Sequence, residues 1–152
     1  PAAGGLGDGT QVAAVVGMGA QGAWMGSRWL TAAEYAEDGG SKAMQKALLA
    51  ATSRDTVRSR IYSGKPARLL KSKWTDAWAA DDAPEPLPMP LQNLLVAEAH
   101  QRISAAQDPE VVAMPAGQII GSLEGVVPVA ETMAQIVAEY EAAVERLRAS
   151  LG

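Results

Sequence analysis

Short apolar stretches separated by glycine-rich corners make up the first part of the chain. Residues 2–3 have the character of the end of one buried strand and residues 22–25 of the next, because both are apolar without alternation. Apolar side chains recur at helical spacing between them, so residues 8–17 are predicted to form a helix capped by Asp8. Strand, helix and strand in this order indicate a parallel α/β unit. Trp24 is expected in its core, with a pocket wall as the alternative.

Capping signals predict two helices after this unit. Thr31 and Glu34 form a capping-box pattern, which predicts a short helix that ends at about Asp38. Ser41 is predicted to cap the next helix, which ends near residue 52. The apolar face of that helix is expected to consist of Met44, Ala47, Leu48 and Ala51.

The middle of the chain contains an alternating pattern, a helical pattern and a proline-rich stretch, in this order. Alternation over residues 55–62 predicts a strand or an extended arm. Pro66 is predicted to begin a helix that carries Trp74 and Trp78 on one face. Residues 81–90 follow, with prolines at 84, 86, 88 and 90. Such a stretch can join neither a helix nor a sheet interior, so we expect a linker that runs extended over the surface.

Three helical patterns are predicted after the linker. They span residues 91–106, residues 115 or 116 to 123, and residues 129–148. The first is expected to turn Leu94, Leu95, Ala99 and Ile103 inward. The last has an amphipathic stripe of Met133, Ile136, Val137, Tyr140, Val144 and Leu147, which is typical of an outer helix that covers a core.

Composition narrows the function classes. The chain has 152 residues, enough for one domain with a core, and no apolar stretch is long enough to span a bilayer. It has no cysteine, which excludes disulfides, thiolate catalysis and cysteine-ligated metals in these residues and fits a cytoplasmic protein. Its carboxylates form neither a catalytic pair nor a metal-ligand spacing, so no metal site is expected.

The net charge of −4 conceals a basic block between residues 54 and 73. The block consists of Arg54, Arg58, Arg60, Lys65, Arg68, Lys71 and Lys73. One interpretation is a solvated basic face. The other is a docking surface for an anionic partner such as an acyl carrier protein, a nucleotide or an acidic subunit. Nucleic acid is not expected, because the chain as a whole is acidic.

Two glycine-rich corners, Gly4-Gly5 and Gly26-Ser27, follow the two predicted strands. A helix must carry the chain back across a parallel sheet before the next strand begins, so both corners fall at the same end of the sheet. Glycine lets the backbone come close to a ligand, and free N–H groups favour an anion. Loops after the last two strands of a (β/α)8 barrel often form such a phosphate site. We therefore interpret the corners as a phosphate clamp.

The chain is shorter than the roughly 250 residues of a whole barrel, and it begins with Pro-Ala-Ala rather than methionine. We expect an α/β fold that is the C-terminal part of a TIM (β/α)8 barrel, with the remainder of that barrel as its partner. Residues 1–40 would hold the βα units with the phosphate loops. Residues 41–114 would form an inserted, mainly helical segment, and residues 115–152 the returning and final helices.

Five motifs occur in a characteristic order: Ala3-Gly4-Gly5-Leu6, Gly19-Ala20-Gln21-Gly22, Met25-Gly26-Ser27-Arg28, Gly64-Lys65-Pro66-Ala67-Arg68 and Ala116-Gly117-Gln118. Together they resemble the nitronate monooxygenase family, formerly the 2-nitropropane dioxygenases. The similarity covers nearly the whole chain and is weakest across the proline linker. The FMN-dependent enoyl-acyl carrier protein reductases share the first and third motifs and are a close second resemblance.

The first resemblance implies an FMN-binding barrel that oxidises alkyl nitronates with O2 to a carbonyl compound and nitrite. It implies that the FMN phosphate is bound by Gly4, Gly5, Gly26 and Ser27 through backbone N–H groups, with the Ser27 hydroxyl as a further donor. The second implies NADH-dependent reduction of an enoyl thioester, with an acidic carrier protein as partner for the basic block. A non-catalytic flavin-binding fragment is the third hypothesis.

Two further residues have two interpretations each, and a third, His100, has one. Arg28 is either a counter-charge to the phosphate or part of an outward salt bridge. Gln118 either faces the flavin or substrate pocket or caps a helix. His100 lies beside polar neighbours and does not match the family's usual catalytic histidine, which the resemblance puts upstream of these residues. His100 is therefore interpreted as a surface residue, and no catalytic residue is named in this chain.

Overall fold

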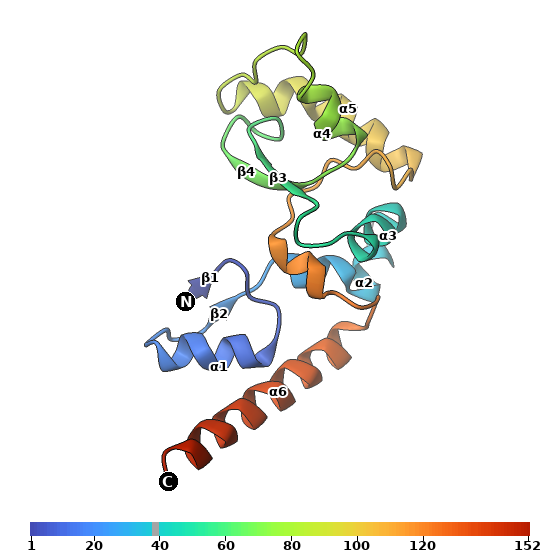
Figure 1. Ribbon diagram of the computed structural model, residues 1–152. Helices are drawn as coiled ribbons and strands as arrows, with labels where there is room; N and C mark the ends of the chain where they lie inside the picture. Colours follow the sequence, from blue (N-terminus) through green and yellow to red (C-terminus); the bar gives the residue numbers. More distant parts are fainter. Residues whose placement is uncertain (38–39) are drawn as a thin grey trace.

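The computed structural model describes residues 1–37 and 40–152. Its strands form two separate pairs, one parallel and one antiparallel. Figure 1 shows the two pairs in different lobes, with helices α2 and α3 between them. Helices and strands are thus mixed along the chain, and the fold class is α/β, as the sequence predicted. No helix in these described ranges is both long and apolar enough to cross a membrane.

The first lobe is the predicted parallel unit. Strand β1 (Ala2–Ala3) pairs with β2 (Ala23–Trp24), and helix α1 (Gly9–Gly17) connects them. Asp8 caps α1, because its Oδ1 accepts the N–H of Gln11 at 2.7 Å. At the other end of α1, Gly19 has a φ of +98°, which a residue with a Cβ rarely adopts. The capping pattern in the sequence therefore gave both ends of this helix correctly.

Helix α6 (Val129–Ser150) lies along α1 (Figure 1). The two backbones come so close at Gly9 that a Cβ there would lie 2.0 Å from the carbonyl oxygen of Ile136. The Gly9 N–H also donates to Glu139 Oε2 at 2.8 Å. Of the predicted apolar stripe on α6, Ile136 is buried. Met133, Val137 and Leu147 are exposed, so the prediction of the stripe as a covered face is wrong at these positions.

Three short helices connect the lobes: the 3-10 helix η1 (Ser27–Thr31), α2 (Ala33–Glu37) and α3 (Lys42–Ala50). Ser41 caps α3 as predicted, with its Oγ accepting the N–H of Met44 at 3.1 Å. The capping box of Thr31 and Glu34 is absent. Thr31 ends η1, and the Glu34 carboxylate instead accepts the distant N–H of Val129 at 3.0 Å.

Two residues near this connection lie outside the described ranges. They are Asp38, at which the short helix was predicted to end, and Gly39, which follows it. In the described part, α2 extends to Glu37.

The second lobe holds an antiparallel ribbon of β3 (Thr56–Ser59) and β4 (Ala67–Leu70). The β3 strand confirms the predicted alternation. The helix predicted from Pro66 is wrong, because residues 67–70 pair with β3, and Leu69 and Leu70 are buried. Helix α4 (Lys73–Trp78) begins only after Ser72. The Ser72 N–H and the Thr75 hydroxyl are joined at 2.9 Å in a capping box that marks this start.

Helix α5 (Leu91–Ala106) has the predicted bounds but a different buried face. Leu94 and Leu95 are 70% and 59% exposed, so the prediction that they point inward is wrong. Gln92 and Val96 are buried in their place. The Gln92 amide donates to the carbonyl of Ile61 and accepts the N–H of Leu87, both at 2.9 Å. Because these bonds satisfy the buried amide, a polar residue fixes the orientation of the helix.

The proline-rich residues 81–90 contain neither helix nor strand, as predicted. They are mostly exposed, which confirms that they run over the surface, and they also contact Gly64. A Cβ at Gly64 would lie 2.4 Å from the backbone nitrogen of Met89. The φ of Gly64 is +87°, so both its conformation and the close approach require glycine.

The main core lies where the two lobes meet. Residues 115–123, predicted as a helix, form an extended stretch followed by the 3-10 helix η2 (Gln118–Ser122). A cluster of buried side chains joins α3, β4 and η2: Met44, Leu48, Leu70, Val112, Ala116, Ile120 and Leu123. The segment that enters this core also pairs with β4, since the Ala116 N–H donates to the Arg68 carbonyl at 3.0 Å. The lobes are therefore connected by a packed core.

Candidate functional site

The two glycine-rich corners lie at the same end of the parallel pair. Ala3 is opposite Trp24 in the register, so Gly4-Gly5 and Gly26-Ser27 both follow the carboxyl ends of their strands. Gly4 and Gly5 have φ values of +93° and +72°. Side chains disfavour these dihedrals, so the sharp turn after β1 depends on glycine. The placement agrees with the arrangement inferred from the sequence.

The space beside the corners is open. A Cβ built on Gly4, Gly5 or Gly26 would meet no protein atom within 4 Å. Among the hydrogen bonds of the described residues, the backbone N–H groups of these three glycines and of Ser27 have no protein acceptor. Free N–H donors in an open glycine turn are what a phosphate group needs. The residues present therefore fit the phosphate of a flavin mononucleotide.

Ser27 connects this corner to the second half of the chain. Its Oγ accepts the backbone N–H of Gly117 at 2.8 Å. The hydroxyl proton remains available to a ligand, because the bond to Gly117 uses only an oxygen lone pair. Gly26, Ser27 and Gly117 line a shallow groove together with Arg68. Gly4 and Gly5 are not among the residues that line this groove, although they lie at the same end of the strands.

Arg68 is the residue of this groove that the sequence interpretation did not single out. It was counted only as part of the basic block, although it ends the motif Gly64-Lys65-Pro66-Ala67-Arg68. Its side chain donates from Nη1 to Thr56 Oγ1 at 3.1 Å. The signal that could have identified Arg68 is its position at the end of this motif. The segment that carries it is a strand rather than the predicted helix.

Arg28 points to a different place. Its Nη2 donates to Gln135 Oε1 at 3.2 Å, and its Nε is buried without a partner. It lines a polar cavity that also contains the carboxylates of Asp8, Glu124 and Glu139. It makes no salt bridge within 4.0 Å to any described carboxylate, so the interpretation as an outward salt bridge is wrong. The interpretation as a counter-charge to the phosphate stays a prediction.

Gln118 is exposed at the start of η2. It follows Gly117 directly but is not among the residues that line the groove. It caps no helix through its side chain in the described structure. A role toward flavin or substrate therefore stays a prediction.

His100 is half-buried, so its interpretation as a surface residue is only partly right. Its ring stacks on Tyr62, with centroids 5.0 Å apart, and meets the edge of Trp74 at 5.8 Å. Its Nε2 is buried without a hydrogen-bond partner. Burial lowers the pKa of His100 below its usual value of 6.5, because desolvation penalises the charged imidazolium. The sequence showed only the polar neighbours of His100, not Tyr62 from the turn after β3 or Trp74 from α4.

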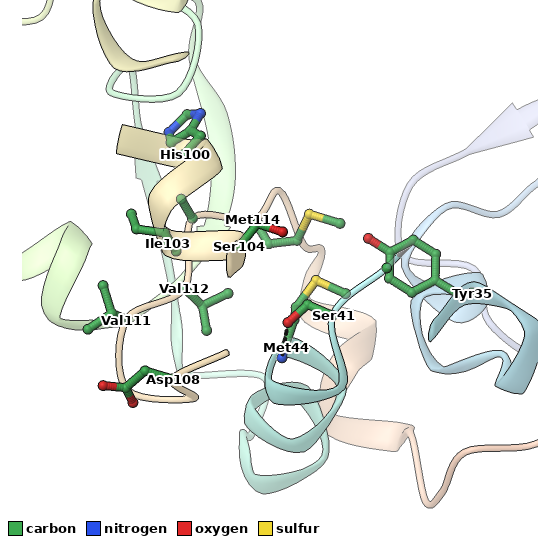
Figure 2. A pocket seen from close by; sticks show the side chains of 12 residues that line it. Tyr35, Ser41, Met44, His100, Ile103, Ser104, Asp108, Val111, Val112 and Met114 are labelled. Atoms are coloured by element: carbon green, nitrogen blue, oxygen red, sulfur yellow. Dashed lines mark hydrogen bonds between the residues drawn. The ribbon is translucent and has the colours of Figure 1, made fainter. Parts of the chain in front are cut away.

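His100 also borders a pocket between α3 and α5 (Figure 2). Figure 2 shows the side chains of Met44, Ile103 and Met114 around this space, with Tyr35 approaching from the opposite side. Met114 lines the pocket, whereas the next residue, Pro115, lines the groove beside Ser27. The pocket and the groove are thus lined by adjacent parts of one stretch of chain.

Trp24 is not in the core, contrary to the preferred expectation. Its side chain is 70% exposed on β2, one residue before the Met25-Gly26-Ser27 corner. The two strands of this sheet provide no further layer over it. Trp74 and Trp78 do share a helix face, and their rings meet edge to face at 5.9 Å.

Charged groups form no metal site in the described parts of the chain, where no three His, Cys, Asp or Glu residues come together. The basic block is spread over the β3–β4 ribbon and its flanks. Within it, Lys73 forms an ion pair with Glu110, and both side chains are largely exposed. Lys73 is thus a member of the block whose charge is paired with a carboxylate.

Comparison with known proteins gives a consistent picture. The profile of the family described as nitronate monooxygenase matches residues 1–139. A putative monooxygenase of Mycobacterium tuberculosis is 45% identical over 145 residues, which cover 91% of this chain and 38% of that protein. A nitronate monooxygenase of Paraburkholderia phytofirmans is 32% identical over 151 residues, 97% of this chain and 39% of that protein. The chain thus spans about two fifths of the length of these relatives.

Solved structures resemble the chain over almost its full length. A nitroalkane oxidase from Streptomyces ansochromogenes superposes with a TM-score of 0.81 at 27% identity, over 95% of this chain and 40% of that one. FabK from Thermotoga maritima superposes with a TM-score of 0.73 at 26% identity, over 97% of this chain and 46% of that one. Both comparisons place the fold of this chain within part of these larger proteins.

Proposed function

Because the chain belongs to the nitronate monooxygenase family, we propose that it forms part of an FMN-dependent (β/α)8 barrel that oxidises alkyl nitronates with O2 to a carbonyl compound and nitrite. The observation that carries the proposal is the pair of open corners at one end of β1 and β2. This is the end at which parallel α/β enzymes place their ligands.

In this proposal, the chain's own contribution is to bind and orient the cofactor. The FMN phosphate is held by the free N–H groups of Gly4, Gly5, Gly26 and Ser27, and the Ser27 hydroxyl donates a further bond. The bound flavin supplies the electron transfer. The described residues offer no partnered acid–base constellation beside the groove, so the catalytic base is proposed to lie in another part of the protein.

The first experiment is to ask which reaction the purified protein catalyses. Propionate 3-nitronate with O2 is expected to give nitrite, and the protein is expected to be yellow with bound FMN. A Gly26→Val variant, which fills the open space at the corner, is the negative control for flavin binding. Absence of nitrite formation by a flavin-loaded wild-type protein contradicts the proposed reaction.

A second candidate is NADH-dependent reduction of an enoyl thioester, as in the FMN-dependent enoyl-acyl carrier protein reductases. The likeness to FabK favours it, with a TM-score close to that of the nitroalkane oxidase. The exposed part of the basic block, including Arg54, Arg58 and Arg60, offers an acidic carrier protein a complementary surface. NADH consumption with an enoyl thioester, without nitrite formation, supports this candidate. Bound flavin without either reaction supports a non-catalytic flavin-binding role.

A further inference from the structure

Arg68 lies beside the corner that is proposed to hold the FMN phosphate. It lines the same groove as Gly26, Ser27 and Gly117, although it comes from the antiparallel ribbon of the other lobe. The groove therefore combines free backbone N–H groups from one lobe with an arginine residue from the other.

Backbone pairing fixes the position of Arg68. Its carbonyl accepts the N–H of Ala116 at 3.0 Å, and the next residue of that segment, Gly117, donates to Ser27 Oγ at 2.8 Å. Two hydrogen bonds and a single peptide step thus connect the Arg68 backbone to the Ser27 side chain. These bonds link the position of β4 to that of the corner.

The side chain of Arg68 is also held from within the ribbon. Its Nη1 donates to Thr56 Oγ1 at 3.1 Å, and Thr56 is buried. This bond uses one of the five N–H donors of the guanidinium group. A planar guanidinium positioned in this way can still offer a pair of donors to phosphate oxygens.

The positive charge of Arg68 is not paired with a negative charge in the described residues. No carboxylate among residues 1–37 and 40–152 forms an ion pair with it. Its cross-strand neighbour is Arg58, and like charges opposite one another destabilise a ribbon. Arg28, the other arginine near the corner, is turned toward Gln135 and a cavity lined by carboxylates.

We propose that Arg68 is the side-chain cation that binds the flavin phosphate, so that the ribbon of the second lobe closes the phosphate site formed by the first. The proposal rests on the proposed function, because it needs FMN at the Gly26-Ser27 corner. It goes beyond that function by making the ribbon part of the cofactor site and by predicting selectivity for FMN over riboflavin, which lacks the phosphate.

The test is to titrate apoprotein with FMN and, separately, with riboflavin, following the quenching of flavin fluorescence. In Arg68→Gln the affinity for FMN is expected to fall by about 10- to 100-fold, the value of one or two charge-assisted hydrogen bonds. The affinity for riboflavin should change less than about threefold, since the lost contact is to phosphate alone. Arg68→Lys keeps the charge but not the paired donors. Its affinity for FMN is therefore expected to lie between those of the wild-type protein and Arg68→Gln.

The matched control is Arg58→Gln on the opposite strand. It removes the same charge from the same ribbon, but Arg58 is exposed and does not line the groove. FMN affinity should therefore stay at the wild-type value. Far-UV circular dichroism and thermal unfolding of each apoprotein show whether the variants fold. If Arg68→Gln is unfolded, Arg68→Lys carries the test.

The outcomes separate the inference from the proposed function. If the wild-type protein prefers FMN over riboflavin and folded Arg68 variants keep that preference, Arg68 does not bind the phosphate, and the proposed function stands. An equal loss of FMN and riboflavin affinity in these variants also overturns the inference, since it indicates a structural role. If the wild-type protein binds neither flavin, the proposed function itself fails.

Discussion

The backbone N–H of Gly117 donates to the side-chain oxygen of Ser27 at 2.8 Å, across 90 residues of sequence. This bond joins the corner after β2 to the segment that returns from the second lobe. It requires a hydroxyl oxygen at position 27 and a main chain that comes close at position 117. Serine at this corner therefore has a structural role as well as the role proposed toward FMN.

Replacing Ser27 with alanine tests that double role. The variant leaves the Gly117 N–H without its acceptor, which is expected to cost about 1 kcal/mol of stability. FMN affinity should fall as well, because the corner loses both a donor and its anchor. Urea unfolding of the apoprotein and flavin titration measure the two effects. Ser27→Thr keeps the hydroxyl, and a threonine variant as defective as alanine would argue against the hydrogen bond as the cause.

Gly26→Val tests the open space at the same corner. A Cβ at Gly26 meets no protein atom within 4 Å, so the variant should fold with nearly wild-type stability. The branched side chain would occupy the volume proposed for phosphate, and FMN binding should be abolished. Gly125→Val is the matched control, since Gly125 has equally open surroundings and lies away from the groove. A Gly26→Val protein that remains fully loaded with flavin contradicts the site assignment.

Local chemistry explains which parts of the fold could be predicted from the sequence. Asp8 and Ser41 cap their helices through bonds to residues three positions later, so the signal and its partner lie in one short stretch. The placement of the two glycine-rich corners at one end of the parallel pair could be predicted for a similar reason. Connection rules for parallel strands place consecutive corners at one end, whatever the rest of the chain does.

The errors arise where distant residues decide the outcome. Residues 67–70 become a strand because β3 and the segment around Pro115 pair with them, and neither partner is visible in local periodicity. Helix α5 buries Gln92 rather than Leu94 because the carbonyl of Ile61 is available as an acceptor. Arg68 was missed for the same reason. Its place in the groove depends on strand pairing that the sequence pattern did not reveal.

Burial of His100 predicts a specific pH dependence of stability. Its folded-state pKa lies below the usual 6.5, so the native state binds fewer protons than the unfolded chain when the pH falls below that value. The contribution of neutral His100 is present above pH 6.5 and is lost as the pH falls through the lowered native value. Urea unfolding at pH 7 and pH 5 should therefore show a larger loss for wild type than for His100→Phe, which keeps a ring against Tyr62. An identical loss in both proteins would mean that His100 titrates normally.

The contact between α1 and α6 predicts opposite effects for two glycines of one helix. At Gly9 a methyl group would lie 2.0 Å from the Ile136 carbonyl oxygen and 2.5 Å from the Tyr140 nitrogen. Gly9→Ala should therefore cost about 1–3 kcal/mol, because backbone must move to relieve the overlap. At Gly17, the last residue of α1, a methyl group meets nothing within 4 Å, and alanine should stabilise the helix by up to about 1 kcal/mol. Thermal and urea unfolding of both variants measure the difference. Equal stability of the two would show that α6 does not pack on the start of α1.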